Sequence, residues 1–226
     1  MTIVLFDIDG TLVSTGGAGR RAYEAAFAEE FGEEHGLLDF SFSGMTDPLL
    51  IRWGLEAAER RVTRELVQRM VERYLEHLPG ELAAGSGYTV YPGVEELVPE
   101  LAGRAELAVG LGTGNVERGA RLKLEPAGIY DYFTFGGFGS DAEDRAEILR
   151  AGAERGAAKL GCDLASTRVV VIGDTPRDVE AAHRIDAECF AVDTGGSDTA
   201  SLREAEPDLL VRDLRSSQIR DGLVSD

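Results

Sequence analysis

From residue 88 onward, short apolar segments alternate with stretches that have helical spacing. Such alternation implies parallel strands joined by right-handed helical crossovers. The apolar segments predict strands over residues 107–111, 132–135, 169–172 and 189–192, and a weaker one over 208–211. An apolar run over residues 3–6 predicts one further buried strand near the beginning of the chain. We therefore expect an α/β fold built on a doubly wound parallel sheet.

A long stretch with helical character separates the first predicted strand from the others. Amphipathic patterns predict helices over residues 20–34, 48–59 and 63–78, with Asp47 as a cap before Pro48. A glycine-rich stretch over residues 79–87, which begins with Pro79, predicts an irregular domain boundary. The expected organisation is a core of residues 1–14 and 88–226, interrupted by an all-helical insertion of residues 15–87.

The charge and composition of the chain exclude some kinds of binding partner. The 226 residues include 41 acidic and 23 basic side chains, which gives a formal net charge of −18. A field of this sign disfavours nucleic acid and anionic membrane surfaces as partners. No apolar run approaches the roughly 18 residues of a membrane-spanning helix, and no signal peptide is evident. The two cysteines, Cys162 and Cys189, predict neither a disulfide framework nor a zinc site. We expect a soluble, cytoplasmic protein.

Polar residues follow three of the predicted strands. Asp7 and Asp9 follow the first strand, Thr113 follows the strand over 107–111, and Asp174 follows the strand over 169–172. Ligands of a doubly wound sheet bind outside the carboxyl ends of its strands, so these side chains are expected to converge. Three carboxylates at one edge repel one another unless a cation lies among them, and their hard oxygen atoms favour Mg²⁺.

The spacing of Asp7 and Asp9 suits the two roles of phosphoryl transfer. Residues two apart on an extended strand leave the same face, so both carboxylates can reach one ligand. A carboxylate suits attack on phosphorus, and the second one can move a proton. The Thr113 hydroxyl and the backbone amides of Gly114 and Asn115 can bind phosphate oxygens. Each motif alone is typical of a turn or a helix cap, but all three together predict a phosphate site.

These motifs together resemble those of the haloacid dehalogenase-like hydrolase superfamily. The segment FDIDGTL over residues 6–12 resembles its first motif, GTGN over 112–115 its second, and GDTPRD over 173–178 its fourth. The resemblance covers nearly the whole chain. It implies a Rossmann-like core with an inserted helical cap, as in the branch that includes phosphoglycolate phosphatase-like enzymes.

The resemblance also assigns roles to individual residues. It implies that Asp7 is the nucleophile, Asp9 the general acid and base, and Thr113 a phosphate ligand. Mg²⁺ would be held by Asp7, the backbone carbonyl of Asp9, and Asp174. Asp178 stands where the family often has a second acidic residue that supports the metal ligands.

The third family motif is absent in its usual form. The family has a lysine, often followed by proline, before the helix that precedes the fourth motif. The only two lysines of the chain, Lys123 and Lys159, lie elsewhere, whereas Arg145 stands at the expected position. Arginine keeps the positive charge and can bind two phosphate oxygens, although its geometry differs from that of lysine. We therefore predict that Arg145 is catalytic, the alternative being a solvated arginine in the first turn of a helix.

Further residues separate the branches of the family. Dehalogenases lack the second aspartate of the first motif, but Asp9 is present here. Phosphonate-cleaving relatives use a lysine of the cap, and residues 15–87 contain none. Phosphoglycolate phosphatase-like members commonly carry Gly-Arg-Thr where this chain has GMTD over 44–47, and Met45 cannot bind an anion. The glycines over 16–19 are expected to form a hinge. Such a hinge would let Arg20 or Arg21 meet the substrate, unless these arginines lie at a solvated helix start.

The main hypothesis is a Mg²⁺-dependent phosphomonoester hydrolase that acts on a small soluble phosphorylated metabolite through a phospho-Asp7 intermediate. A phosphomutase of the β-phosphoglucomutase type and a pyrophosphatase share the same core motifs and stay open. A non-catalytic module that binds a phosphorylated ligand or a metal is a further alternative. A receiver-type signalling switch fits poorly. Its phospho-acceptor follows a strand in the middle of the chain, whereas Asp7 follows the first strand, and it needs no helical insertion.

Overall fold

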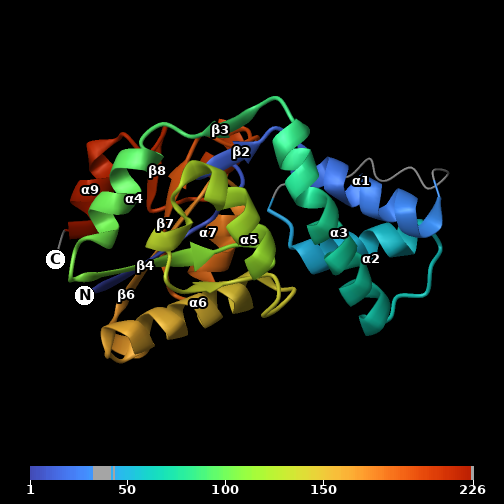
Figure 1. Cartoon of the computed structure of the whole chain (residues 1–226). Helices are drawn as coiled ribbons and strands as arrows, with labels where there is room; N and C mark the ends of the chain where they lie inside the picture. Colours follow the sequence, from blue (N-terminus) through green and yellow to red (C-terminus); the bar gives the residue numbers. More distant parts are fainter. Residues whose placement is uncertain (33–41, 43, 225–226) are drawn as a thin grey trace.

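Six strands form one parallel sheet in the computed structural model, which describes residues 1–32, 42 and 44–224 (Figure 1). Their order is β5-β4-β1-β6-β7-β8, and every neighbouring pair is parallel. The strands are β1 (Thr2–Phe6), β4 (Leu107–Gly112), β5 (Gly136–Gly137), β6 (Arg168–Gly173), β7 (Glu188–Val192) and β8 (Leu209–Val211). The strand order reverses on either side of β1, so the predicted doubly wound α/β sheet is confirmed.

Alternate side chains of β1 enter two separate cores, one on each face of the sheet. Ile3 and Leu5 pack with the helices of one face, and Val4 and Phe6 pack with those of the other. All five residues of β1 are buried, as expected for a central strand that is covered on both sides. The first face carries α6 (Arg145–Leu160), α7 (Pro176–His183) and α8 (Thr199–Glu204), and the second carries α4 (Val94–Ala102), α5 (Glu117–Leu124) and α9 (Ser217–Val224).

Three helices form a separate group beside the sheet, which we call the cap (Figure 1). They are α1 (Ala18–Phe31), α2 (Asp47–Ala57) and α3 (Arg64–Ala84). The cap has its own apolar core, in which the rings of Tyr23 and Tyr74 stack with their centroids 4.1 Å apart. The third helix carries the amphipathic pattern that buries Met70 and Leu78 against the other two.

A two-stranded antiparallel ribbon lies where the chain leaves the sheet for the cap and returns from it. Its strands are β2 (Val13–Thr15) and β3 (Tyr88–Val90). Beside the ribbon, Gly16 has a φ of +58°, and a Cβ atom there would come within 2.8 Å of the Ser86 carbonyl oxygen. The close approach of these two connections requires a glycine. The division of the chain into residues 15–87 and the remainder stays a prediction.

The predicted strand over residues 132–135 is wrong. Residues Tyr130–Tyr132 form a short 3₁₀ helix, and the edge strand β5 follows at Gly136–Gly137. A Cβ atom at Gly137 would lie 1.9 Å from the Ile148 carbonyl oxygen, so only glycine lets this strand lie against α6. The preceding aromatic residues fill the core instead, as in the edge-to-face contact of Phe133 with Phe6.

Two predicted helix boundaries also need correction. The stretch over 79–87 is not irregular throughout, because α3 continues through Pro79 to Ala84. Proline removes one helical hydrogen bond, but Leu78 is buried and Leu82 packs on the cap core, so contacts on both sides of Pro79 maintain the helix. The helix predicted over 20–34 runs from Ala18 to Phe31, and residues 33–34 lie outside the described part. No described helix is both long and apolar enough to cross a membrane.

Candidate active site

The carboxyl ends of β1, β4 and β6 bring the polar motif residues to one edge of the sheet. β1 pairs in register with both neighbours, so the residues that follow the three strands emerge side by side. The backbone N–H of Asp7 donates to the Ile172 carbonyl at 2.9 Å, and that of Thr113 donates to the Gly137 carbonyl at 3.1 Å. Asp7, Thr113 and Asp174 are all buried. Parallel topology alone therefore assembles side chains that are far apart in the sequence.

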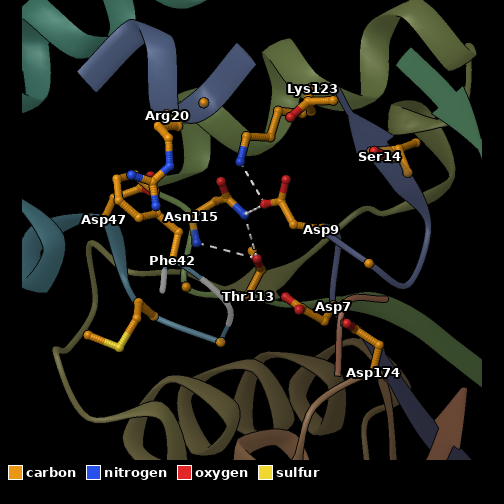
Figure 2. A pocket seen from close by; sticks show the side chains of 18 of the residues that line it. Asp7, Asp9, Ser14, Arg20, Phe42, Asp47, Thr113, Asn115, Lys123 and Asp174 are labelled. Carbon is orange, nitrogen blue, oxygen red and sulfur yellow. Dashed lines mark hydrogen bonds and ion pairs between the residues drawn. The ribbon is translucent and has the colours of Figure 1, made fainter. Parts of the chain in front are cut away.

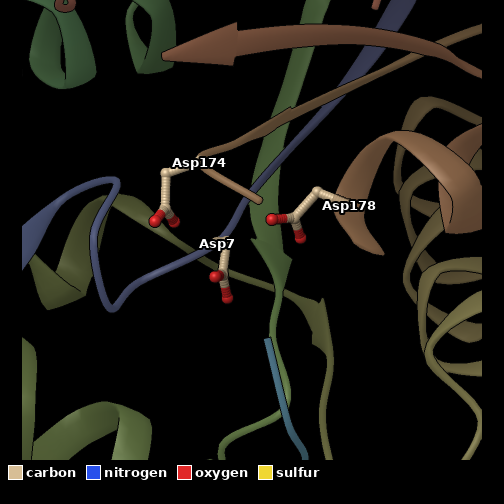
Figure 3. Close-up of side chains that lie close together, drawn as sticks. All are labelled: Asp7, Asp174 and Asp178. Atoms are coloured by element: carbon tan, nitrogen blue, oxygen red, sulfur yellow. The ribbon is translucent and has the colours of Figure 1, made fainter. Parts of the chain in front are cut away.

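An acidic cluster of Asp7, Asp174 and Asp178 occupies this edge (Figure 3). One carboxylate oxygen of each lies within 4.8 Å of the others, and all three residues are buried. Burial raises the pKa of Asp7 to about 6, with Arg145 opposing this change and Asp178 adding to it. Burial also raises the pKa of Asp174 well above its usual value, with repulsion from Asp178 and Asp7 acting in the same direction. Buried carboxylates that repel one another in this way fit a divalent cation.

The side chain of Asp174 is enclosed by backbone. Thr11 donates its hydroxyl hydrogen to Oδ1 at 3.0 Å. A Cβ atom at Gly10 would lie 2.1 Å from Oδ2, and one at Gly195 would lie 1.6 Å from it. Gly10 also has a φ of +91°, which favours glycine. Both glycines are therefore needed to leave room for this carboxylate.

Arg145, at the beginning of α6, joins the acidic cluster on the side of Asp7. Its Nε donates to Oδ1 of Asp178 at 2.7 Å, and its Nη2 lies 3.0 Å from Oδ1 of Asp7. Thr175 donates its backbone N–H and its hydroxyl to the second Asp178 oxygen, at 3.0 and 2.6 Å. Burial acts to lower the pKa of Arg145, but the carboxylates of Asp178 and Asp7 outweigh it and raise the pKa above its usual value. The arginine is thus a fixed positive charge beside Asp7.

Asp9 is held by two donors on the opposite side of the site (Figure 2). Its Oδ2 accepts hydrogen bonds from Lys123 Nζ at 2.6 Å and from Asn115 Nδ2 at 2.9 Å. Asn115 Nδ2 also donates to the Thr113 hydroxyl at 2.9 Å, and the Asn115 backbone N–H donates to the same oxygen at 3.3 Å. Thr113, Asn115 and Asp9 therefore form one hydrogen-bonded group, to which Lys123 contributes a charge.

A cavity of ≈330 Å³ joins these groups to the cap. Its cap wall includes Arg20, Phe42 and Met45, and the Arg20 guanidinium carbon lies 4.2 Å from the centre of the Phe42 ring. Of the two arginines expected to meet a substrate, only Arg20 lines this cavity. Arg21 instead donates its Nε to Glu81 at 2.7 Å. The core wall contains Asp7, Asp9, Thr113, Gly114, Asn115, Lys123, Arg145 and Asp174.

Asp47 connects the cap to Gly114 and Val116 of the core in a way that the sequence did not predict. Its side chain does not cap its own helix, because Oδ2 accepts the backbone N–H of Val116 at 2.8 Å. Val116 is the N-cap residue of α5, so a carboxylate of the cap satisfies an N–H group at the beginning of a core helix. The Asp47 backbone N–H also donates to the Gly114 carbonyl at 2.8 Å. A Cβ atom at Gly114 would lie 2.3 Å from the Met45 carbonyl oxygen, so glycine permits this contact.

Sequence reasoning missed Lys123 as a site residue. The family lysine is expected at the position of the third motif, whereas Lys123 lies in α5, after the second motif. Its signal was its place on the buried face of α5, in line with Ala120 and Leu124. A lysine on a buried helix face requires a partner of opposite charge, which is Asp9.

Comparisons with known proteins agree with this arrangement. A family model described as haloacid dehalogenase-like hydrolase matches residues 1–186. The chain is 28% identical over 213 residues to a phosphoglycolate phosphatase of Synechococcus elongatus, covering 93% of this chain and 92% of the relative. It is 24% identical over 219 residues to the pyrophosphatase PpaX of Oceanobacillus iheyensis, covering 94% and 92%.

The fold has relatives among solved structures. A hydrolase from Pseudomonas syringae superposes with a TM-score of 0.71 over the full length of both chains, at 20% sequence identity. The overall fold of this chain is thus one that is known from a solved structure.

Proposed function

Because this chain belongs to the haloacid dehalogenase-like hydrolase family, we propose that it is a Mg²⁺-dependent phosphomonoester hydrolase that acts on a small phosphorylated metabolite. The proposal is carried by a single observation: Asp7, Asp9, Thr113 and Arg145 line one cavity at the carboxyl edge of a parallel sheet. Its volume, ≈330 Å³, is at the low end for ligand sites, which favours a small substrate.

The proposed reaction has two steps that share one intermediate. A carboxylate oxygen of Asp7 attacks phosphorus, the bond between phosphorus and the ester oxygen breaks, and Asp9 gives the departing oxygen a proton. The phosphoryl group stays on Asp7 and the alcohol leaves. Water then attacks phosphorus while Asp9 takes a proton from it, and the bond to Asp7 breaks to release inorganic phosphate. Each step has a lower barrier than direct attack of water on the ester.

The other residues bind and neutralise the phosphoryl group. We assign the Thr113 hydroxyl and the backbone amides of Gly114 and Asn115 to its oxygens, with Arg145 replacing the family lysine as the positive charge beside Asp7. Arg20, in the cap wall, would contact the rest of the substrate.

The acidic cluster supports a magnesium site. Asp7, Asp174 and the backbone carbonyl of Asp9 would hold Mg²⁺, which when bound neutralises the carboxylates and the phosphoryl oxygens. Both oxygens of Asp178 accept hydrogen bonds, from Arg145 and Thr175, so this residue would support the ligands rather than join them.

The cap, proposed to span residues 15–87, would close over the reaction. Closure excludes water that competes with the ester, and opening releases the products. The glycines over residues 16–19 support a hinge, because Gly16 and Gly17 both have positive φ values. The proposed setting is the cytoplasm, where small phosphorylated metabolites are available.

The test is phosphate release from a panel of small phosphoesters and pyrophosphate, with Mg²⁺ and with a chelator. We expect Mg²⁺-dependent release from at least one ester. Release from pyrophosphate alone would favour a pyrophosphatase, and isomerisation of a sugar phosphate without release would favour a phosphomutase. Binding of Mg²⁺ without turnover of any compound would contradict an enzyme and favour a binding module.

Mg²⁺ binding should weaken as the pH falls through about 6. Burial raises the pKa of Asp7 to about 6, so in the folded protein a proton competes with the metal below that pH. At about 100 Kd of Mg²⁺ near pH 7.5, the free energy of unfolding should rise by about 2.7 kcal/mol. For a chain of this size, that raises Tm by about 5–10 °C. Thermal unfolding with and without Mg²⁺ checks this, and an equal Tm shift at pH 5 would exclude Asp7 from the metal site.

A further inference from the structure

We propose that Lys123 is a positioning residue that holds the Asp9 carboxylate in place for proton transfer to the leaving group. The inference rests on the proposed function, because it assigns Lys123 a task only if Asp9 is the general acid and base. It adds a residue of the core helix α5 to the motif residues that the sequence singled out.

The geometry singles out one oxygen of Asp9. Lys123 Nζ and Asn115 Nδ2 both bind Oδ2, at 2.6 and 2.9 Å. The Asp9 side chain is 44% exposed, whereas that of Lys123 is 6% exposed. A half-exposed carboxylate turns readily about its side-chain bonds unless donors hold it. With Oδ2 held by two donors, Oδ1 is the oxygen assigned to the departing group.

Lys123 is itself held firmly. It lies on the buried face of α5, and its backbone carbonyl accepts the Tyr88 hydroxyl at 2.7 Å. A Cβ atom at Gly19 would lie 3.7 Å from Nζ, so the first turn of the cap helix α1 covers the ammonium group. The lysine is therefore a rigid, charged support rather than a mobile surface group.

The consequence concerns how the reaction depends on the leaving group. An alkoxide is a poor leaving group, so cleavage of an alkyl phosphate needs the Asp9 proton in the first step. The nitro group of 4-nitrophenyl phosphate stabilises the departing anion, so this ester needs no proton. Lys123 also stabilises the charge that appears on Asp9 as its proton leaves. Loss of Lys123 should thus impair alkyl esters far more than the aryl ester.

The experiment compares kcat/KM for two substrates, 4-nitrophenyl phosphate and the alkyl phosphate that the wild-type protein hydrolyses best. kcat/KM reports the steps up to departure of the leaving group, which separates them from hydrolysis of the intermediate. For Lys123→Met we expect a fall of about 10²-fold with the alkyl ester and less than about 5-fold with the aryl ester. Lys123→Arg keeps the charge and should recover most of the alkyl activity.

The matched control is Lys159→Met, which removes the other lysine of the chain. Lys159 contacts Thr134 on the surface, so its loss should leave both rates unchanged. An equal fall with both esters, or no fall, for Lys123→Met overturns the proposal. Lys123→Gln is prepared in parallel, and failure of both neutral variants to fold would show a structural role and likewise overturn it. Absence of turnover by the wild-type protein would instead refute the proposed function.

Discussion

Replacing Asp7 with asparagine is expected to reduce phosphate release more than about 10³-fold, because the amide cannot form the phosphoryl bond of the proposed mechanism. Folding should be preserved, since the amide group has nearly the same size as the carboxyl group that it replaces. When both proteins are measured without Mg²⁺, the variant should unfold at a higher Tm than the wild type. Burial and repulsion raise the pKa of Asp7, so the ionised carboxylate destabilises the metal-free fold at neutral pH.

The measurement is phosphate release with the best ester of the panel, together with thermal unfolding in a chelator. Asp131→Asn provides the control, because Asp131 is exposed and lies outside the cavity. Retention of more than about one-tenth of the activity by Asp7→Asn would exclude a covalent role for this residue. A lower Tm would show that Asp7 stabilises the metal-free fold.

Replacing Arg145 with methionine should impair both stability and activity. The change leaves Asp178 buried with Thr175 as its remaining donor, and it removes the positive charge beside Asp7. Breaking a buried ion pair costs about 3–5 kcal/mol, and the two Thr175 bonds place the expected loss near about 3 kcal/mol. For a chain of this size, Tm should fall by about 6–12 °C. Phosphate release should fall at least about 10²-fold.

Two further variants separate the structural loss from the catalytic one. Adding Asp178→Asn to Arg145→Met removes the unpaired charge and should restore part of the Tm without restoring activity. Arg150→Met, on the exposed side of α6, is the control and should change Tm by less than about 2 °C. Full activity of Arg145→Met at a temperature where it is folded would show that another group replaces the family lysine.

The sequence was sufficient to predict those parts of the fold in which a residue pattern reflects the topology directly. The apolar run of β1 and the alternation after residue 88 predicted the sheet, and the resemblance predicted the family, and both predictions are confirmed. The sequence was insufficient to predict those elements in which tertiary packing overrides the local conformational preference of the residues. The edge strand Gly136–Gly137 lies against α6 because Gly137 has no side chain to meet the Ile148 carbonyl. Pro79 stays helical because residues on both sides of it pack on the cap core.

The residues of the candidate site likewise fall into those whose place the sequence predicted and those whose place it did not. The motif residues Asp7, Thr113 and Asp174 follow strands, so parallel topology brought them together as expected. Lys123 and Asp47 enter from helices, and which way a helical side chain points depends on the rotation of the packed helix. That rotation is set by tertiary contacts, such as the bond from Val116 to Asp47, which cross between segments distant in sequence. The predicted roles of the site residues stay predictions.

The hydrogen bond between Asp47 and the beginning of α5 restricts which helical insertions could replace this one. A helical insertion that made no bonds to its core could be exchanged without disturbing that core. Here the insertion supplies a carboxylate that the core helix uses as its own N-terminal partner. A transplanted insertion without an acceptor at position 47 would leave that N–H group unbonded and loosen the neighbouring residues that we propose as phosphate ligands. The cap and the beginning of α5 therefore depend on each other for their hydrogen bonds, and neither can be exchanged without the other.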